Sequence, residues 1–179
     1  MKITGEGYTA DVNSDKQLTV AGTSIGSLAD AALRGDAYAW CNVSANIDAT
    51  DTGLLVRNDS KTRLLVIDTI FLWVDVATAV QIHCPGPGIT LAGTVVTGEN
   101  LSRSSNKTAP ASAYADETGN TQANIIKTVF VPDGSTLPHT VVDVKGAVVL
   151  SYDESIALDV VAESVAYNFT VWGYFVDAN

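Results

Sequence analysis

Residues 140–177 constrain the fold of this chain most, because they read as three β-strands with no room for a helix between them. Apolar residues recur there at every second position, and residues with this spacing face the same side of a pleated sheet. Val, Tyr, Phe, Trp and Thr, which suit that surface, are frequent in the stretch. It predicts an antiparallel β-sandwich or barrel and argues against a catalytic α/β fold. In the last strand, the predicted inner face carries Val165, Tyr167, Phe169, Val171 and Phe175.

The rest of the body also reads as strands separated by turns. Turn-forming residues fill segments 48–52, 58–61, 85–88 and 132–135. We expect about eight strands, and therefore an all-β, jelly-roll-like antiparallel β-sandwich. Residues 101–120 are expected to form a long surface loop, and loops of that length usually have a function or a contact. The further expected strands are residues 37–47, 54–57, 62–76, 80–84, 89–97 and 123–131.

The longest expected strand, residues 62–76, is apolar on both faces. A strand of this kind is covered on both sides. Its second cover could be a loop, the N-terminal segment or another subunit. The two predicted faces are Leu64, Val66, Ile70, Leu72, Val74 and Val76 on one side and Leu65, Ile67, Phe71 and Trp73 on the other.

Residues 1–35 differ in character from the body, residues 36–179, and we interpret them as an N-terminal arm. A short strand is expected within residues 16–23. A short helix is expected at 27–34, with Ser27 as its N-cap and Gly35 as its stop; it either packs on the body or is part of an extended arm. Exposing the apolar residues of the arm to water would cost about 25 cal/mol per Å². We therefore expect the arm to attach the protein to neighbouring subunits through residues that include Leu18, Val20, Leu28 and Leu33.

The composition disfavours several classes of partner. The chain has 179 residues, 46% of them hydrophobic and 17% charged, which is typical of a globular domain. Its formal net charge of −10 disfavours nucleic acid and anionic membranes. The sequence contains no run of about 18 apolar residues, so no transmembrane helix is expected. The first residues show no signal-peptide pattern, so we expect synthesis in a cytoplasm.

No motif predicts catalysis, a metal site or a cofactor. Cys41 and Cys84 are expected to be free thiols, because two cysteines make no disulfide framework. His83 and Cys84 are adjacent and so diverge on a strand, which disfavours a shared metal ion. His139 is an ordinary residue at a strand start. The acidic pairs that could serve a glycosidase are Asp153 with Glu154, Asp116 with Glu117, and Asp68 with Asp75; they lie in turns or on opposite faces.

The tryptophans, Trp40, Trp73 and Trp172, could form a sugar-stacking platform or anchor a core or a subunit interface. The neighbours of Trp73 and Trp172 favour the core or interface interpretation. Aromatic residues are frequent in protein interfaces. The interface residues predicted in the body are Phe71, Trp73, Trp172 and Tyr174.

Five short strings of the sequence are distinctive: Gly-Asp-Ala-Tyr-Ala-Trp at 35–40, Asn-Ile-Asp-Ala-Thr-Asp-Thr at 46–52, Asn-Asp-Ser at 58–60, Ala-Asp-Glu-Thr-Gly-Asn-Thr-Gln-Ala-Asn at 115–124 and Gly-Tyr-Phe at 173–175. In these strings the chain resembles small structural proteins of tailed bacteriophages that are uncharacterised or assigned to the virion head. The likeness runs from about Arg34 to Val176, and the arm matches less clearly.

This resemblance implies a non-enzymatic virion component, most simply a capsid decoration protein that stabilises the head. It implies no catalytic residues and no cofactor. We expect a homo-oligomer, specifically a trimer, whose other partners are the major capsid protein or further virion proteins. The alternative from another class is a carbohydrate-binding or receptor-binding β-sandwich module of a fibre or tail.

Overall fold

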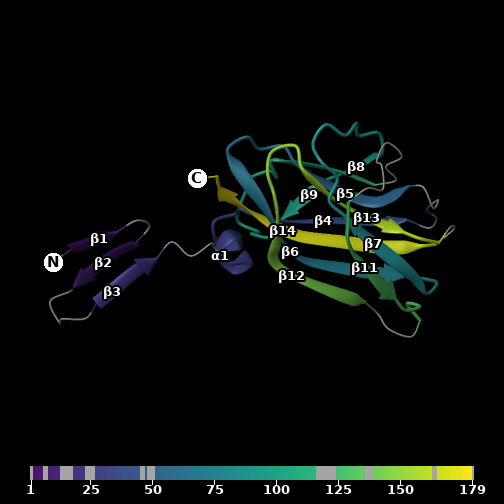
Figure 1. Cartoon of the computed structure of the whole chain (residues 1–179), viewed down its shortest axis with the longest axis horizontal. Coiled ribbons are helices and arrows are strands. Elements are labelled where there is room, and N and C mark those ends of the chain that lie inside the picture. Colours follow the sequence, from purple (N-terminus) through teal and green to yellow (C-terminus); the bar gives the residue numbers. More distant parts are fainter. Residues whose placement is uncertain are drawn as a thin grey trace.

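A computed structural model describes most of the chain: residues 2–5, 8–12, 18–22, 27–44, 47, 51–115, 124–135, 139–162 and 165–178. Two antiparallel sheets pack face to face as a sandwich (Figure 1). The five-stranded sheet has the order β12-β6-β14-β4-β9, and the six-stranded sheet has the order β11-β7-β13-β5-β10-β8.

The strands of the five-stranded sheet are β4 (Ala37–Ser44), β6 (Arg63–Val74), β9 (Gly98–Asn100), β12 (Thr140–Leu150) and β14 (Tyr167–Asp177). Those of the six-stranded sheet are β5 (Thr52–Asn58), β7 (Thr78–His83), β8 (Thr94–Val96), β10 (Ala111–Ala115), β11 (Ile125–Val131) and β13 (Ser155–Val160).

Eight of these strands have jelly-roll connectivity. Numbered along the chain without β8, β9 and β10, the two sheets have the orders 6-3-8-1 and 5-4-7-2. This is the arrangement of two four-stranded sheets, each made of strands far apart in sequence, that defines a double-sheet jelly roll. The predicted all-β sandwich is therefore confirmed.

The three extra strands all come from the connection between β7 and β11. They extend the sheets beyond β4 and β5, with β9 pairing with β4 and β10 with β5. The prediction of a continuous loop over residues 101–120 is therefore wrong at β10, because Ala111–Ala115 completes the edge of a sheet. Residues 116–120 lie outside the described part of the chain.

The core lies between the two sheets and is rich in aromatic rings. Tyr167 and Phe169 have ring centroids 4.6 Å apart, and Phe175 meets Tyr38 edge to face at 5.9 Å. Each fully buried side chain of this size contributes about 1.5–3 kcal/mol. The inner face predicted for residues 165–175 is confirmed: Val165, Tyr167, Phe169, Val171 and Phe175 are all in the core cluster.

A β-bulge in β6 changes which residues share a face. The register against β14 shifts between Trp172, opposite Thr69, and Gly173, opposite Ile67, so Asp68 is the extra residue. A one-residue insertion reverses the alternation of faces beyond it. The predicted faces are therefore wrong on one side of the bulge: Leu65 and Ile67 join Ile70, Leu72 and Val74 in the core.

Helix α1 (Leu28–Leu33) precedes the sandwich and packs on the outer face of the five-stranded sheet. The side chain of Ser27 accepts a hydrogen bond from the backbone N–H of Asp30, and Gly35 follows the helix with a φ of +71°. Both predicted helix signals are thus confirmed. No helix in the described ranges is long and apolar enough to cross a membrane.

An ion-pair network fixes the junction between α1 and the sandwich. The buried Asp36 carboxylate lies 3.1 Å from the Arg63 guanidinium and 3.0 Å from Lys107 Nζ, which also donates to the carbonyl oxygen of Arg34. Burial raises the pKa of Asp36, but the hydrogen bond from Lys107 and the charge of Arg63 outweigh it, so the pKa lies below its ordinary value. The network holds the start of the body against α1.

Before α1, β1 (Lys2–Gly5), β2 (Tyr8–Val12) and β3 (Leu18–Gly22) form a separate antiparallel sheet. In Figure 1 this small sheet lies apart from the sandwich, beyond α1. The strand expected within residues 16–23 is confirmed by β3, whereas β1 and β2 were not predicted. α1 falls inside the segment 1–35 that we interpret as an arm, although it packs on the body.

Candidate interaction surface

The outer face of the five-stranded sheet carries a row of apolar residues that crosses four strands. Phe71 on β6 pairs with Val141 on β12 and Thr170 on β14, and Thr170 pairs with Cys41 on β4. Paired residues in an antiparallel sheet share a face. Val43, two positions from Cys41 on β4, lies on the same face in the neighbouring row, where it pairs with Asn168.

Two aromatic rings lie at the centre of this face. Phe71 and Trp172 have ring centroids 4.9 Å apart at an interplanar angle of 62°, and both side chains are half-buried. On the strands that flank these rings, Val141 on β12 is 56% exposed and Val43 on β4 is 65% exposed. We call Val43, Phe71, Val141 and Trp172 the outer patch.

The chain itself covers the regions on either side of the outer patch. On one side α1 closes over Val66 and Tyr174, which form a small cluster with Ala31 and partly buried Leu28. On the other side the indole of Trp73 lies against Gly134, where even an added Cβ would come within 2.0 Å of the ring nitrogen. The outer patch is therefore an uncovered apolar surface that lies between two covered regions of the same sheet face.

Charged groups border the outer patch rather than interrupting it. Asp143 on β12 pairs with Thr69 in the row that contains Trp172, and Glu99 ends that row on β9. Asp143 also forms an exposed ion pair of 2.9 Å with Lys145. The surface thus has an apolar centre and a charged rim, as protein interfaces do.

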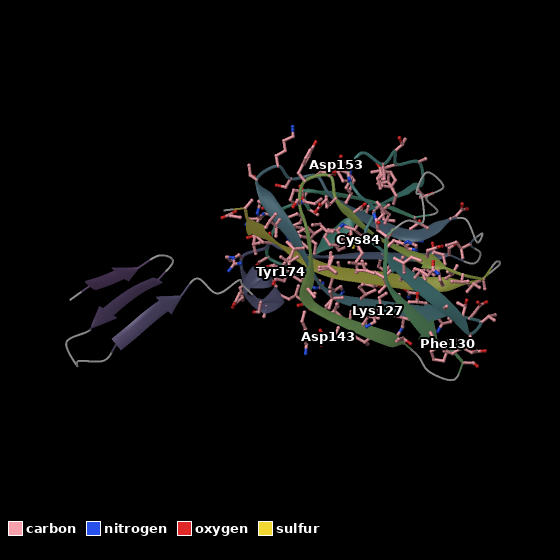
Figure 2. The ribbon with its side chains drawn as sticks, viewed as in Figure 1. Cys84, Lys127, Phe130, Asp143, Asp153 and Tyr174 are labelled. Atoms are coloured by element: carbon pink, nitrogen blue, oxygen red, sulfur yellow. The ribbon has the colours of Figure 1, made fainter. Side chains whose placement is uncertain are left out.

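The structure places the predicted interface residues in several different environments. Phe71 and Trp172 come together in the outer patch, and Trp73 lies beside it under its own turn. Tyr174, only 5% exposed, packs with Leu28 beneath α1, and its position is shown in Figure 2. Leu33 is 86% exposed, and Leu18 and Val20 are in β3.

A buried polar pair on the six-stranded sheet was not predicted. His83 Nε2 lies 3.9 Å from Asp159 Oδ2, and the two side chains are 0% and 2% exposed. Burial raises the pKa of Asp159 to about 7, and the charge of Asp51 adds to the effect. Because Ile82 is in the core, the alternation of β7 predicts that His83 lies on the opposite face of the sheet. The sequence does not indicate the partner of His83, because Asp159 lies on β13, 76 positions further along the chain.

The remaining candidates for chemistry lie apart or in structural turns. Cys41 is exposed on β4, while Cys84 lies after β7 and has a pKa raised by burial and by Glu154; both are free. Asp153, labelled in Figure 2, accepts a hydrogen bond from the Gly88 N–H. Its carboxylate lies 3.5 Å from the Arg57 guanidinium. Among the described residues no three His, Cys, Asp or Glu side chains gather as metal ligands.

The other acidic pairs also have local roles or lie outside the description. Glu154 accepts from the Ser151 N–H, and Asp75 accepts from the Ala166 N–H. Asp68 accepts from the Thr69 hydroxyl. Asp116 and Glu117 lie outside the described residues. The described acids thus serve turns and bulges.

Comparisons with known proteins add little to this geometry. No protein-family model matches the sequence, and no curated protein matches it. A chain of the Israel acute paralysis virus pentamer is 10% identical over 96% of this chain, with a TM-score of 0.21. This chain spans 57% of the length of that viral chain. The weak resemblance is to a viral capsid protein and is not specific to tailed phages; at this TM-score it carries no argument.

Proposed function

We propose that the protein is a non-enzymatic structural component of a virus particle that decorates and stabilises the capsid of a tailed phage. The observation that carries this proposal is the outer patch, an apolar surface with a charged rim that the described part of the chain leaves uncovered. Exposed apolar patches of this kind mark interaction surfaces. Jelly rolls occur in viral capsid proteins, which is an analogy at the level of the fold alone.

The geometry of the aromatic pair favours a protein partner. Phe71 and Trp172 meet edge to face at 62°. A sugar-stacking platform presents coplanar exposed rings, whereas these rings are half-buried and tilted. We propose that the patch belongs to a homo-oligomer, specifically a trimer, and that other faces of the trimer contact the major capsid protein.

The test is the copy number of this chain in purified virions, measured by quantitative mass spectrometry against the major capsid protein. Decoration requires hundreds of copies in each particle. About a dozen copies or fewer would instead indicate a neck, vertex or tail position. If the chain is missing from purified particles, the proposal is wrong.

A carbohydrate-binding or receptor-binding module is the second candidate. It is favoured by Trp172, a half-exposed indole that lies two positions from Thr170 on β14 and in the same cross-strand row as the acidic Asp143. Titration with host-surface glycans while tryptophan fluorescence is recorded tests this candidate. Saturable quenching that Trp172→Ala abolishes would support it, whereas unchanged emission would leave the structural role.

A further inference from the structure

The small N-terminal sheet is amphipathic. In its register Ile3 pairs with Ala10, and Ala10 pairs with Val20. Two positions further along β2, Val12 pairs with Leu18. Residues that alternate along a strand belong to opposite faces. One face therefore holds Ile3, Gly5, Tyr8, Ala10, Val12, Leu18, Val20 and Gly22, whereas the other holds Lys2, Thr4, Thr9, Asp11, Thr19 and Ala21.

A three-stranded sheet of this kind needs a second layer. A sheet becomes stable when its apolar face packs against another element. No strand pairing joins β1, β2 or β3 to the sandwich sheets in the described ranges, and Figure 1 shows the small sheet separate from them. The apolar face that the register predicts therefore needs a second layer from another element.

The sandwich offers a matching half. The small sheet is about 10 Å wide between its outer strand axes and about 17 Å long. The outer patch crosses four strands, about 14 Å between outer axes, and extends about 13 Å along them from Trp172 to the row of Asn168. The two surfaces are therefore of similar size, and neither has a charge at its centre.

Helix α1 places the end of the arm on the same sheet face as the outer patch. α1 directly follows the small sheet in sequence and covers Val66 and Tyr174 on the outer face. Trp172, two positions from Tyr174 on β14, begins the outer patch. The surface covered by α1 and the outer patch are thus continuous, so a second layer on the patch would extend a contact that the fold already makes.

We propose that the β1–β3 sheet of one copy packs its apolar face on the outer patch of a second copy, so that arms are exchanged around a closed ring. This inference rests on the proposed homo-oligomer and names its interface. The arm and the patch are different surfaces, so the contact is heterologous, and a heterologous contact whose rotation closes gives a ring instead of an open filament. Each copy has a net charge of −10, so two copies repel each other wherever their acidic surfaces meet. A contact made by apolar surfaces avoids placing these like charges together.

A native thiol makes the contact testable. Cys41 is exposed and lies in the row of the outer patch. In full-length protein with Cys84→Ser, a single cysteine is introduced on the apolar face of the arm, as Ile3→Cys, Val12→Cys or Val20→Cys in separate variants. Each variant is oxidised with diamide and resolved by non-reducing electrophoresis. Thr19→Cys, on the opposite face of β3, is the matched control.

Arm exchange predicts covalent oligomers up to the full ring for at least one of the three variants, because each copy contributes one arm and one Cys41. Adding Cys41→Ser should return that variant to a single chain of 18.7 kDa. Cross-linked dimers that survive Cys41→Ser would mean that arms pack on each other. Monomers, with or without an internal disulfide, would mean that the arm does not reach a second copy. Either result overturns the proposal.

Light scattering supplies a second readout that needs no cross-link. Val20→Asp and Val141→Asp, one on each proposed surface, should each reduce the oligomer to monomers. Thr19→Asp and Phe130→Asp are the matched controls, since Phe130 is 70% exposed on the other sheet (Figure 2), and both should leave the mass unchanged. Monomers in solution together with hundreds of copies in each virion would contradict arm exchange. That result would still support the proposed decoration role.

Discussion

The sandwich and the small N-terminal sheet use the same β-sheet alternation with opposite consequences. In the sandwich, two apolar faces close on each other, and Trp40, Tyr167 and Phe169 are completely buried. The small sheet has one apolar face and, within the described residues, no second sheet of its own. The body can therefore fold as a single chain, whereas the arm sheet needs a partner to bury its apolar face.

The difference predicts where mutations act. Changes inside the sandwich should alter the free energy of unfolding, whereas changes in the small sheet should alter assembly.

Trp40→Ala should have the largest effect. Trp40 is fully buried on β4 with its ring centroid 6.1 Å from that of Tyr38. Truncating a buried tryptophan costs about 3–5 kcal/mol, because the side chain leaves a cavity. Urea denaturation followed by circular dichroism measures the loss, with Val95→Ala, 71% exposed, as the control. Equal midpoints for the two variants would mean that the sandwich is not the stability core.

Asp159 should make the stability of the body depend on pH. Its pKa is raised to about 7 in the folded state, so the folded protein keeps this proton while the unfolded chain, ionising near pH 4, has lost it. The contribution of the protonated form is complete below about pH 4 and is lost as pH rises to about 7. At about 1.4 kcal/mol per pKa unit, the fall is a few kcal/mol.

Asp159→Asn should remove this slope, as read from urea midpoints between pH 4 and pH 8. Asp133→Asn is the control: the hydrogen bonds of Ser135 lower the pKa of Asp133, so its contribution changes only at more acidic pH. An unchanged slope in the Asp159 variant would refute the assignment of this titration to Asp159.

Asn58 should be the next most sensitive position. Its side-chain amide donates to the carbonyl oxygens of Arg63 at 2.8 Å and Leu150 at 2.9 Å, and its oxygen accepts from the Ser60 N–H. The residue thereby links the end of β5 to β6 and β12 in the opposite sheet. Asn58→Ala leaves those groups without partners and should cost about 2–3 kcal/mol.

Asn58→Asp separates the two kinds of hydrogen bond at this site. The carboxylate keeps the acceptor for Ser60 but loses both donors. A loss of stability similar to that of Asn58→Ala would show that the link to Arg63 and Leu150 is what matters. A wild-type midpoint in both variants would contradict the role of Asn58.

The sequence predicts the parts of the fold that depend on local alternation. Residues 165–175 alternate without interruption, and their inner face is as predicted. In β6 the same reasoning fails, because the bulge at Asp68 appears only in the register against β14. Local spacing contains no information about the register between distant strands.

The same limit applies to the sites. Phe71 and Trp172 were predicted separately as interface residues, but their contact depends on a pairing between strands about 100 positions apart. His83 and Asp159 meet across β7 and β13 for the same reason. The amphipathic character of the small sheet becomes visible only once β1, β2 and β3 are paired, since β1 and β2 are too short to show alternation alone.

The smallest effect on the sandwich is expected from removing the arm sheet. A chain lacking residues 1–26 retains α1 and its cover over Val66 and Tyr174, so its melting temperature should equal that of the monomeric full-length protein. A chain lacking residues 1–35 also loses α1 and exposes those two residues, which should cost about 1–2 kcal/mol of apolar burial. Both chains should still melt cooperatively.

This pair of deletions distinguishes the two roles of the N-terminal segment. Light scattering should show monomers for both truncated chains, since both lack the β1–β3 sheet, and both should fail to bind capsids. Stability should fall only in the second, because only α1 packs on the sandwich. Val20→Asp in full-length protein provides the reference for an arm that is present but unable to dock. If the first deletion destabilises the monomer as much as the second, the small sheet belongs to the fold of its own chain, and the distinction between a self-sufficient body and a partner-dependent arm is wrong.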